Sequence, residues 1–264
     1  MTAVPFSIRR TLLIAGATLR ESARQRVFGL LVVLALGLVF GVRYLRDFNF
    51  GSPEAKFIAD FGDGAIAFFG AILTVVVTAQ VFLGEIENRT ALTLLAKAVR
   101  RTEFVFGKYL GVVVVTALFC AVMGGALAAV LWTMGLGAAD GIRGALQFGA
   151  PGWGALAAVC WLQWLKLAML GAGTLLVACF AQTQLYTVMV GSAIWVVCHL
   201  QNLAPENSMV RRVIGAVFPD FQLFPTSVDA AMTAGDLARL TFYAGGHVAV
   251  TCALAAYVFS KREL

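Results

Sequence analysis

Charged side chains are scarce in this chain. Only 13% of its 264 residues are Asp, Glu, Lys or Arg, whereas about 25% is usual in soluble domains. Hydrophobic residues make up 60%, and the mean hydropathy is +0.86. Such a small share of polar side chains cannot cover the surface of a soluble protein. The sequence therefore predicts an integral membrane protein and excludes an ordinary soluble domain.

Patterns that bind nucleotides or metals are absent as well. A phosphate-binding loop requires Gly-x-x-x-x-Gly-Lys followed by Ser or Thr, and Gly107-Lys108-Tyr109 lacks both the earlier glycine and the hydroxyl residue. The five cysteines form no CxxC pair or other metal spacing, so we interpret them as small buried apolar residues. We therefore expect no enzyme activity, no catalytic residue, no metal and no cofactor bound by this chain.

Long apolar runs are what the sequence has instead. An α-helix needs roughly 17 to 25 apolar residues to cross about 30 Å of hydrocarbon, and runs of this length without alternating polarity exclude barrel strands. The sequence predicts an all-α protein with one membrane domain, 1–264, and six spans at 27–45, 65–83, 109–131, 156–181, 185–200 and 242–259. Six spans place both termini on the same side.

Basic residues are divided unevenly between the two sides of these spans. Twelve of the 20 Lys and Arg fall on the side of the termini and seven on the other, with Lys166 inside a span. Lys and Arg are enriched in cytoplasmic loops, so we expect cytoplasmic termini in a bacterial cytoplasmic (inner) membrane. The net charge of +6 fits an anionic inner leaflet, and no basic aromatic patch suggests nucleic-acid binding.

Two further segments are predicted to form helices outside the spans. Within residues 1–26, Ile8, Leu12, Ala15 and Leu19 recur at helical spacing, which predicts an amphipathic helix lying in the cytoplasmic interface on that apolar stripe. Between the fifth and sixth spans, a short apolar run at 210–217 precedes two Phe-Pro pairs. Proline ends helices, so short outer or re-entrant helices are expected there.

The segment between the second and third spans is dense in charge and amphipathic. An apolar stripe with i, i+3, i+4 and i+7 spacing is formed by Leu92, Leu95, Ala96 and Val99. Such a stripe needs a partner, either a protein or the lipid surface. Thr102 is predicted to cap the third span, with Glu103 at the positive end of its dipole.

This segment and the six-span layout resemble the permease subunits of type 2 ATP-binding cassette (ABC) transporters. The match runs from Gly84 to Gly111 and reads Gly-Glu-x-Glu-x-x-Thr-x-x-x-Leu-Leu, then a basic turn, then Phe-x-x-Gly-Lys-Tyr-Leu-Gly. Ala98 departs from the family pattern, because relatives commonly have Pro before the basic turn. The resemblance implies a cytoplasmic coupling helix that docks on a separate ABC ATPase. Its docking residues would be Glu85, Glu87, Arg89, Thr90, Leu92, Leu94, Leu95, Lys97, Arg100 and Arg101.

The resemblance also implies a function. The chain would be a permease that couples ATP hydrolysis to export or translocation of an unidentified substrate, with ATP and magnesium on the partner ATPase. A second permease copy, as a homodimer or a paralogous heterodimer, and the lipid bilayer would be its other partners. Two alternatives stay open: a force-transmitting or scaffold subunit that moves no solute, and, more remotely, an intramembrane serine hydrolase built from Ser192, His199 and His247.

A few polar residues fall inside the predicted spans. Gln80, Gln163 and Lys166 are candidates for a conduit, although Lys166 is also placed to extend toward an interface marked by nearby tryptophans. Every Asp and Glu is expected in a loop or at the end of a span. Carriers driven by an ion gradient usually have carboxylates inside their spans, so this distribution favours ATP as the energy source.

Overall fold

The computed structural model describes residues 7–44, 54–87, 100–133, 152–201, 215, 218–224 and 233–261. Its α-helices are α1 (Ile8–Arg24), α2 (Arg26–Gly41), α3 (Glu54–Glu87), α5 (Arg101–Thr133), α7 (Gly152–Phe180), α8 (Gln184–Leu200) and α10 (Ala234–Lys261). Two short 3-10 helices, η1 (Val42–Tyr44) and η4 (Phe221–Leu223), complete the described part, which contains no strand. The prediction of an all-α membrane protein is confirmed at this level.

Four helices are long and apolar enough to cross a membrane. They are Phe57–Gly84 of α3, Arg101–Thr133, Leu156–Phe180 of α7 and Ala234–Lys261. The pair α1 and α2 forms a fifth candidate, bent by 66° at its junction. The apolar helix α8 has 17 residues, roughly 25 Å at 1.5 Å per residue, which is short for a span. Each predicted span coincides with a helix, but the six-span layout itself stays a prediction.

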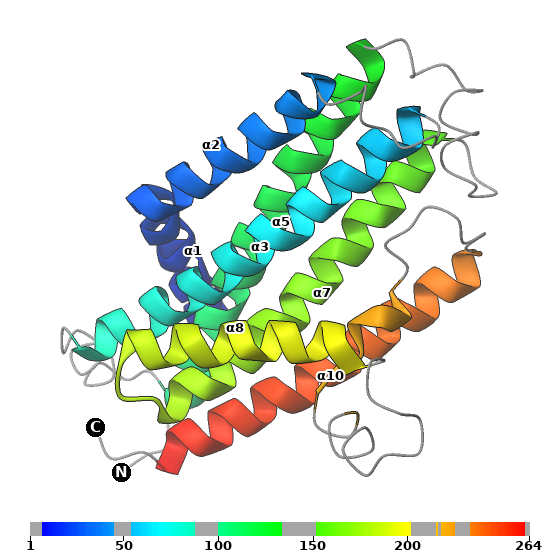
Figure 1. Ribbon diagram of the computed structural model, residues 1–264. Helices are drawn as coiled ribbons and strands as arrows, with labels where there is room; N and C mark the ends of the chain where they lie inside the picture. Colours follow the sequence, from blue (N-terminus) through cyan, green and yellow to red (C-terminus); the bar gives the residue numbers. More distant parts are fainter. Residues whose placement is uncertain are drawn as a thin grey trace.

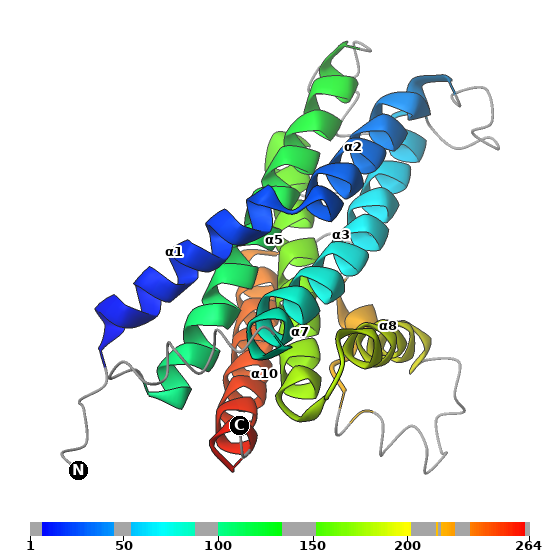
Figure 2. The same ribbon diagram turned by 90° about the vertical axis from the view of Figure 1, so that its left-hand side faces the viewer.

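The helices pack around α7, which contacts α3, α5, α8 and α10. Figure 1 shows α2, α3 and α7 running in the same slanting direction, with α8 crossing α7 nearly horizontally. Figure 2 shows α8 nearly end-on, while α7 and α10 are seen along their length. The central position of α7 explains why 83% of its apolar window is buried, compared with 33% for α10.

The helix α3 begins earlier than the sequence predicts. Its apolar run was expected at 65–83, whereas the helix starts at Glu54 and its candidate span at Phe57. Ile58 is fully buried in the hydrophobic core, and Phe57 packs against it, so the apolar face continues through a stretch that also contains acidic residues. Asp63 therefore lies inside the span and is 4% exposed. The prediction that every acid lies in a loop or at a span end is wrong.

The segment after α8 folds back onto its end. Gln201 Nε2 donates to the carbonyl oxygens of Pro219 at 3.0 Å and Phe218 at 3.4 Å, and Gln222 Nε2 donates to the carbonyl of His199. These bonds place η4 against the C-terminal end of α8. Most of the apolar run 210–217 lies outside the described residues, so η4 is the short helix that the structure shows between α8 and α10 in the described part.

All five cysteines are described, and all are free thiols. Cys120, Cys179, Cys198 and Cys252 are buried, and Cys160 is half-buried. The interpretation of the cysteines as mostly buried apolar residues is confirmed.

Candidate functional site

Three parts of the chain meet where α5 begins. Arg101 Nη1 donates to the carbonyl oxygen of Ser260 at 3.2 Å, so the start of α5 contacts the end of α10. The backbone N–H of Ser7 donates to Glu103 at 2.7 Å, which brings the start of α1 to the same place. The C-terminal ends of α3 and α10 lie at this end of the bundle, the lower left in Figure 1. The end of α3 and the start of α5, the two helix ends that flank 88–99, therefore both lie here.

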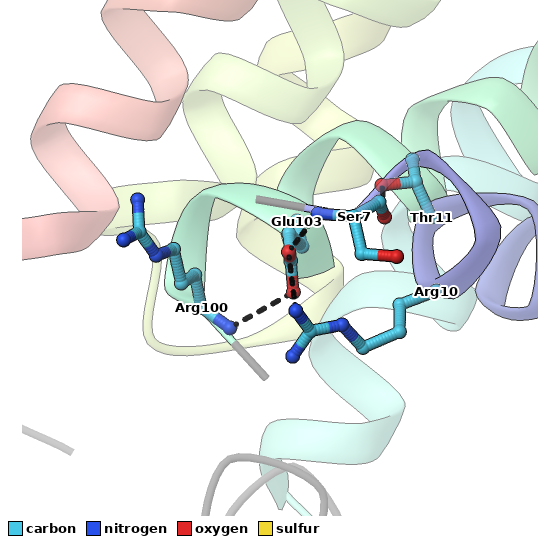
Figure 3. Close-up of polar contacts among 5 residues, drawn as sticks. All are labelled: Ser7, Arg10, Thr11, Arg100 and Glu103. Carbon is cyan, nitrogen blue, oxygen red and sulfur yellow. Dashed lines mark hydrogen bonds and ion pairs between the residues drawn. The ribbon is translucent and has the colours of Figure 1, made fainter. Parts of the chain in front are cut away.

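Glu103 is the centre of the polar contacts with Ser7, Arg10 and Arg100, as Figure 3 shows. Its side chain is 0% exposed, and its Oε1 lies 3.5 Å from Arg10 Nη2. The same Oε1 accepts the N–H of Ser7 at 2.7 Å, and Oε2 accepts the N–H of Arg100 at 3.2 Å. Three donors compensate the cost of burying a carboxylate. Glu103 thus connects α1 to the first residue described after 88–99.

Glu103 also determines how α5 begins. The helix starts at Arg101, so Arg100 is its N-cap and Glu103 is the third helical residue. A carboxylate at that position that accepts the N-cap N–H is one half of a capping box. The prediction that Thr102 caps this helix is wrong, because Thr102 already lies in the first turn. The predicted placement of Glu103 near the positive end of the dipole is confirmed.

Two glycines of α5 admit α1 at very short range. A Cβ on Gly107 would lie 2.8 Å from Ile14 Cβ and 3.0 Å from the carbonyl oxygen of Thr11. A Cβ on Gly111 would lie 2.5 Å from Thr18 Cβ. Any side chain at either position would therefore push α1 away. Gly107-x-x-x-Gly111 works as a contact surface for α1, as small-residue pairs do between membrane helices.

This close approach decides which face of α1 is buried. Thr11, Thr18 and Ser22 face the bundle because only short side chains fit against the glycines. Ile8 and Leu12, which the sequence predicts on the lipid-facing stripe, are 69% and 58% exposed. The helix itself is present, and its place in the membrane interface stays a prediction. The bulky apolar side chains point outward, where a helix lying in a bilayer interface inserts them into lipid.

Lys108 provides a second ionic link between α1 and α5. It is buried, and its Nζ lies 3.6 Å from Glu21 Oε2 on α1. The ammonium also lies 5.8 Å from the centre of the Phe104 ring, within the range of a cation–π interaction. Glu103 at one level and Lys108 about one turn deeper therefore hold α1 against α5 at two points.

A cluster of three aromatic rings lies close to these polar contacts. Phe82 of α3, Phe104 of α5 and Phe259 of α10 are fully buried, with ring centroids 5.3 to 5.8 Å apart. Aromatic pairs at such distances stabilise a contact beyond the area they bury. The cluster joins the two helices that flank 88–99 to the last helix of the chain. Nothing in the spacing of these phenylalanines indicates that they meet.

Only part of the predicted docking set falls in the described residues. Glu85 and Glu87 lie in the last turn of α3, Arg100 is exposed at the N-cap of α5, and Arg101 is half-buried. Arg101 is turned toward the carbonyl oxygens at the end of α10. The other docking residues lie outside the described residues: Arg89, Thr90, Leu92, Leu94, Leu95 and Lys97.

The polar residues predicted inside the spans separate into two groups. Gln80 is half-buried on α3, whereas Gln163 and Lys166 are buried on α7. Gln163 Nε2 donates to Asp63 Oδ2 at 2.6 Å, a contact that the sequence did not indicate. Lys166 does not reach an interface, since its ammonium is fully buried near this carboxylate. The expectation that it extends to the membrane surface is wrong.

The residues of the hydrolase alternative lie on two helices. Ser192 is exposed on α8, beside Phe68 and Trp195. His199 Nδ1 lies 3.0 Å from the carbonyl oxygen of Trp195, and His247 Nδ1 lies 3.4 Å from Thr251 Oγ1. Each histidine thus contacts a residue one turn away on its own helix.

Comparison with known families gives the classification. The sequence model of the ABC-2 family transporter proteins matches residues 12–264, almost the whole chain. The chain belongs to the ABC-2 transporter family. The resemblance to type 2 ABC permeases is thereby confirmed, and with it the class of membrane protein that works with an ABC ATPase. A search of curated proteins gives no match.

Several residues of the family-like sequence have contacts that explain them in this ABC-2 permease. Phe104 is in the aromatic cluster, Gly107 and Gly111 admit α1, and Lys108 pairs with Glu21. Within the pattern Phe-x-x-Gly-Lys-Tyr-Leu-Gly, the two glycines and the lysine therefore lie on the face of α5 that receives α1. Sequence reasoning assigned these three residues by resemblance and missed this physical role, because their partners on α1 lie about 90 residues earlier in the chain.

Proposed function

We propose that this protein is the permease subunit of an ABC transporter in which residues 88–99 form a coupling helix that docks on a separate cytoplasmic ATPase. ATP and magnesium bind to that ATPase, and its motion drives export or translocation of a substrate. The observation that carries the proposal is the buried Glu103, which connects the end of 88–99 to α1. A segment fixed in this way transmits a push to the bundle instead of absorbing it.

The two helices that flank the segment are long enough to carry such a push across a membrane. The helices α3 and α5 have 34 and 33 residues, each roughly 50 Å at 1.5 Å per residue. Phe82 and Phe104 join them beside 88–99, and Phe259 adds α10. Displacement of 88–99 would therefore move three helices together with α1.

The proposal places both termini in the cytoplasm of a bacterium and the protein in its inner membrane. Ser7 and Ser260 contact the same turn of α5, so the start of α1 and the end of α10 lie at the end of the bundle where α5 begins. The excess of Lys and Arg on that side favours the cytoplasm. A second permease copy, identical or paralogous, completes the unit, because two ATPases enclose nucleotide between them.

Pull-down of the ATPase in detergent tests the docking role of 88–99. Replacing Leu92 and Leu95 with Asp would place two charges in a desolvated interface, and we expect complete loss of the ATPase. Arg100→Glu should weaken retention only at low salt, since exposed rim charges act mainly on the association rate and are screened. Arg101 is unsuitable as a probe because it binds the end of α10.

The matched control replaces two leucines that α1 exposes. Leu12→Asp with Leu13→Asp makes the same two substitutions on leucines that are exposed on α1, and we expect it to leave the ATPase bound. Retention of the ATPase by a folded Leu92→Asp, Leu95→Asp protein would contradict the docking role and favour adsorption of 88–99 to lipid. Measuring solute flux in vesicles that contain the whole complex distinguishes transport from force transmission to an outer partner.

A further inference from the structure

A cluster of buried polar side chains joins α3 to α7. Asp63 of α3 is 4% exposed, and Gln163 and Lys166 of α7 are 2% and 3% exposed. Gln163 donates to Asp63 Oδ2 at 2.6 Å, and Lys166 lies one turn further along the same face of α7. Lys166 is the middle residue of α7. The cluster therefore lies inside two candidate spans, the most buried pair among the four, about two turns from the start of the α3 span.

The polar groups of this cluster are only partly satisfied. Among the described residues, Asp63 Oδ1 and Lys166 Nζ have no hydrogen-bond partner. The two groups are nevertheless close enough for each charge to act on the other. Charges inside a membrane are costly unless they pair or hydrogen-bond. Asp63 on α3 and Lys166 on α7 therefore attract each other without forming a direct ion pair in this arrangement.

Glycines on both helices line the contact between α3 and α7 near the cluster. A Cβ on Gly70 of α3 would lie 2.7 Å from Leu167 Cδ1, and a Cβ on Gly171 of α7 would lie 3.3 Å from Thr74 Cγ2. The missing side chains let the two helices approach closely, with Leu167 filling the space beside Gly70. A shift of α3 along α7 changes the separation of Asp63 and Lys166, and it requires Leu167 to leave this space.

We propose that Asp63 and Lys166 are a switched ion pair, open in the arrangement described and closed when α3 shifts along α7. Gln163 holds the carboxylate in the open arrangement. The three side chains are positioning residues that set the relative stability of two arrangements of the permease. The source of the shift rests on the proposed function, since α3 leads directly into 88–99 and would move with the ATPase.

Thermal unfolding of the complex with its ATPase in lipid nanodiscs tests the proposal. The variants are Asp63→Asn, Lys166→Gln and both together, each without nucleotide and with a non-hydrolysable ATP analogue. Each single change leaves one buried charge alone, so we expect the double variant to lose less than the sum of the two. The difference between the summed losses of the single variants and the loss of the double variant should be larger with the analogue, by about 2 to 4 °C in the unfolding midpoint.

An exposed ion pair on α10 provides the matched control. Asp236 and Arg239 lie 3.9 Å apart, with side chains that are 43% and 87% exposed, so Asp236→Asn and Arg239→Gln should add in both nucleotide states. Additive losses for Asp63→Asn and Lys166→Gln would refute the pair. Equal non-additivity in the two states would refute the switch and leave a purely structural contact.

Two further variants keep the test decisive where a single variant does not fold. Asp63→Lys with Lys166→Asp retains both charges in exchanged positions, and we expect recovery of folding. Gln163→Leu removes the donor that holds the carboxylate and should raise the non-additivity without nucleotide to the level seen with the analogue. No effect of Gln163→Leu would also refute the switch. Failure of the wild-type chain to bind an ATPase refutes the proposed function, whereas additivity in the isolated chain refutes the pair independently.

Discussion

Two regions of the molecule differ in how their buried charges are paired. Where α5 begins, the carboxylate of Glu103 has three donors and the ammonium of Lys108 lies beside Glu21. Where α3 packs against the middle of α7, Asp63 has one donor, Gln163, and Lys166 Nζ has no hydrogen-bond partner among the described residues. The charged groups of the first region are paired as they stand, and those of the second are not.

This difference indicates which part of the permease is rigid and which part changes. A fully hydrogen-bonded polar network favours one arrangement of its helices, whereas a partly satisfied one leaves room for another. The glycine contact adds to this, because α1 is held on α5 both by Glu103 and by direct backbone approach at Gly107 and Gly111. We therefore expect α1 and α5 to move as one body, and α3 to move relative to α7.

Removing the satisfied carboxylate should have the largest effect. Glu103→Ala leaves the N–H groups of Ser7 and Arg100 without their acceptor and Arg10 without its carboxylate. We expect a loss of about 3 kcal/mol in stability, or roughly 6 to 12 °C in the unfolding midpoint in detergent. Glu103→Gln, which keeps one acceptor oxygen, should lose less than half of this. A midpoint unchanged by Glu103→Ala would show that this end of the bundle is not held by its polar contacts.

Filling the contact between α1 and α5 should have an intermediate effect. Gly111→Val forces a side chain into Thr18, where a Cβ alone would lie at 2.5 Å, and overpacking of this kind costs about 1 to 3 kcal/mol. The displaced α1 should also become open to proteolysis after Arg24. Gly125→Val is the matched control on the same helix, because nothing lies within 4 Å of a Cβ there. Equal stability of the two variants would contradict the close packing of α1.

The helices were largely predictable from the sequence, because long apolar runs allow few other structures. The start of α3 was not, since Asp60 and Asp63 interrupt the run while Ile58 and Phe57 still face the core. Hydropathy averages over both faces of a helix, whereas packing selects one. The same limit applies to α1, because its apolar stripe indicates the lipid-facing side and not that Thr11, Thr18 and Ser22 are buried.

The polar contacts were not predictable in the same way, because their partners are distant in sequence. Glu103 was placed correctly at a helix start, but its bond to Ser7 joins residues 96 positions apart. Lys166 was recognised as unusual, yet the carboxylate that faces it lies on a helix whose start was misplaced. Local rules predict caps and dipole charges, and only the packing of α1 and α3 shows which charges meet.

The smallest effect is expected for Lys108, although it is as deeply buried as Glu103. Its partner Glu21 is 44% exposed, so Lys108→Met removes a buried charge and leaves behind a carboxylate that water can solvate. Replacing a buried charge by an apolar side chain of similar volume is often neutral, and we expect a change within about 1 kcal/mol. Glu21→Gln should cost more than Lys108→Met, because it takes the carboxylate of Glu21 away from a buried ammonium. Unfolding midpoints of the two variants decide the order. The reverse order would mean that Lys108 itself, through its contact with Phe104, holds α1 in place, and that the satisfied region depends on more than Glu103.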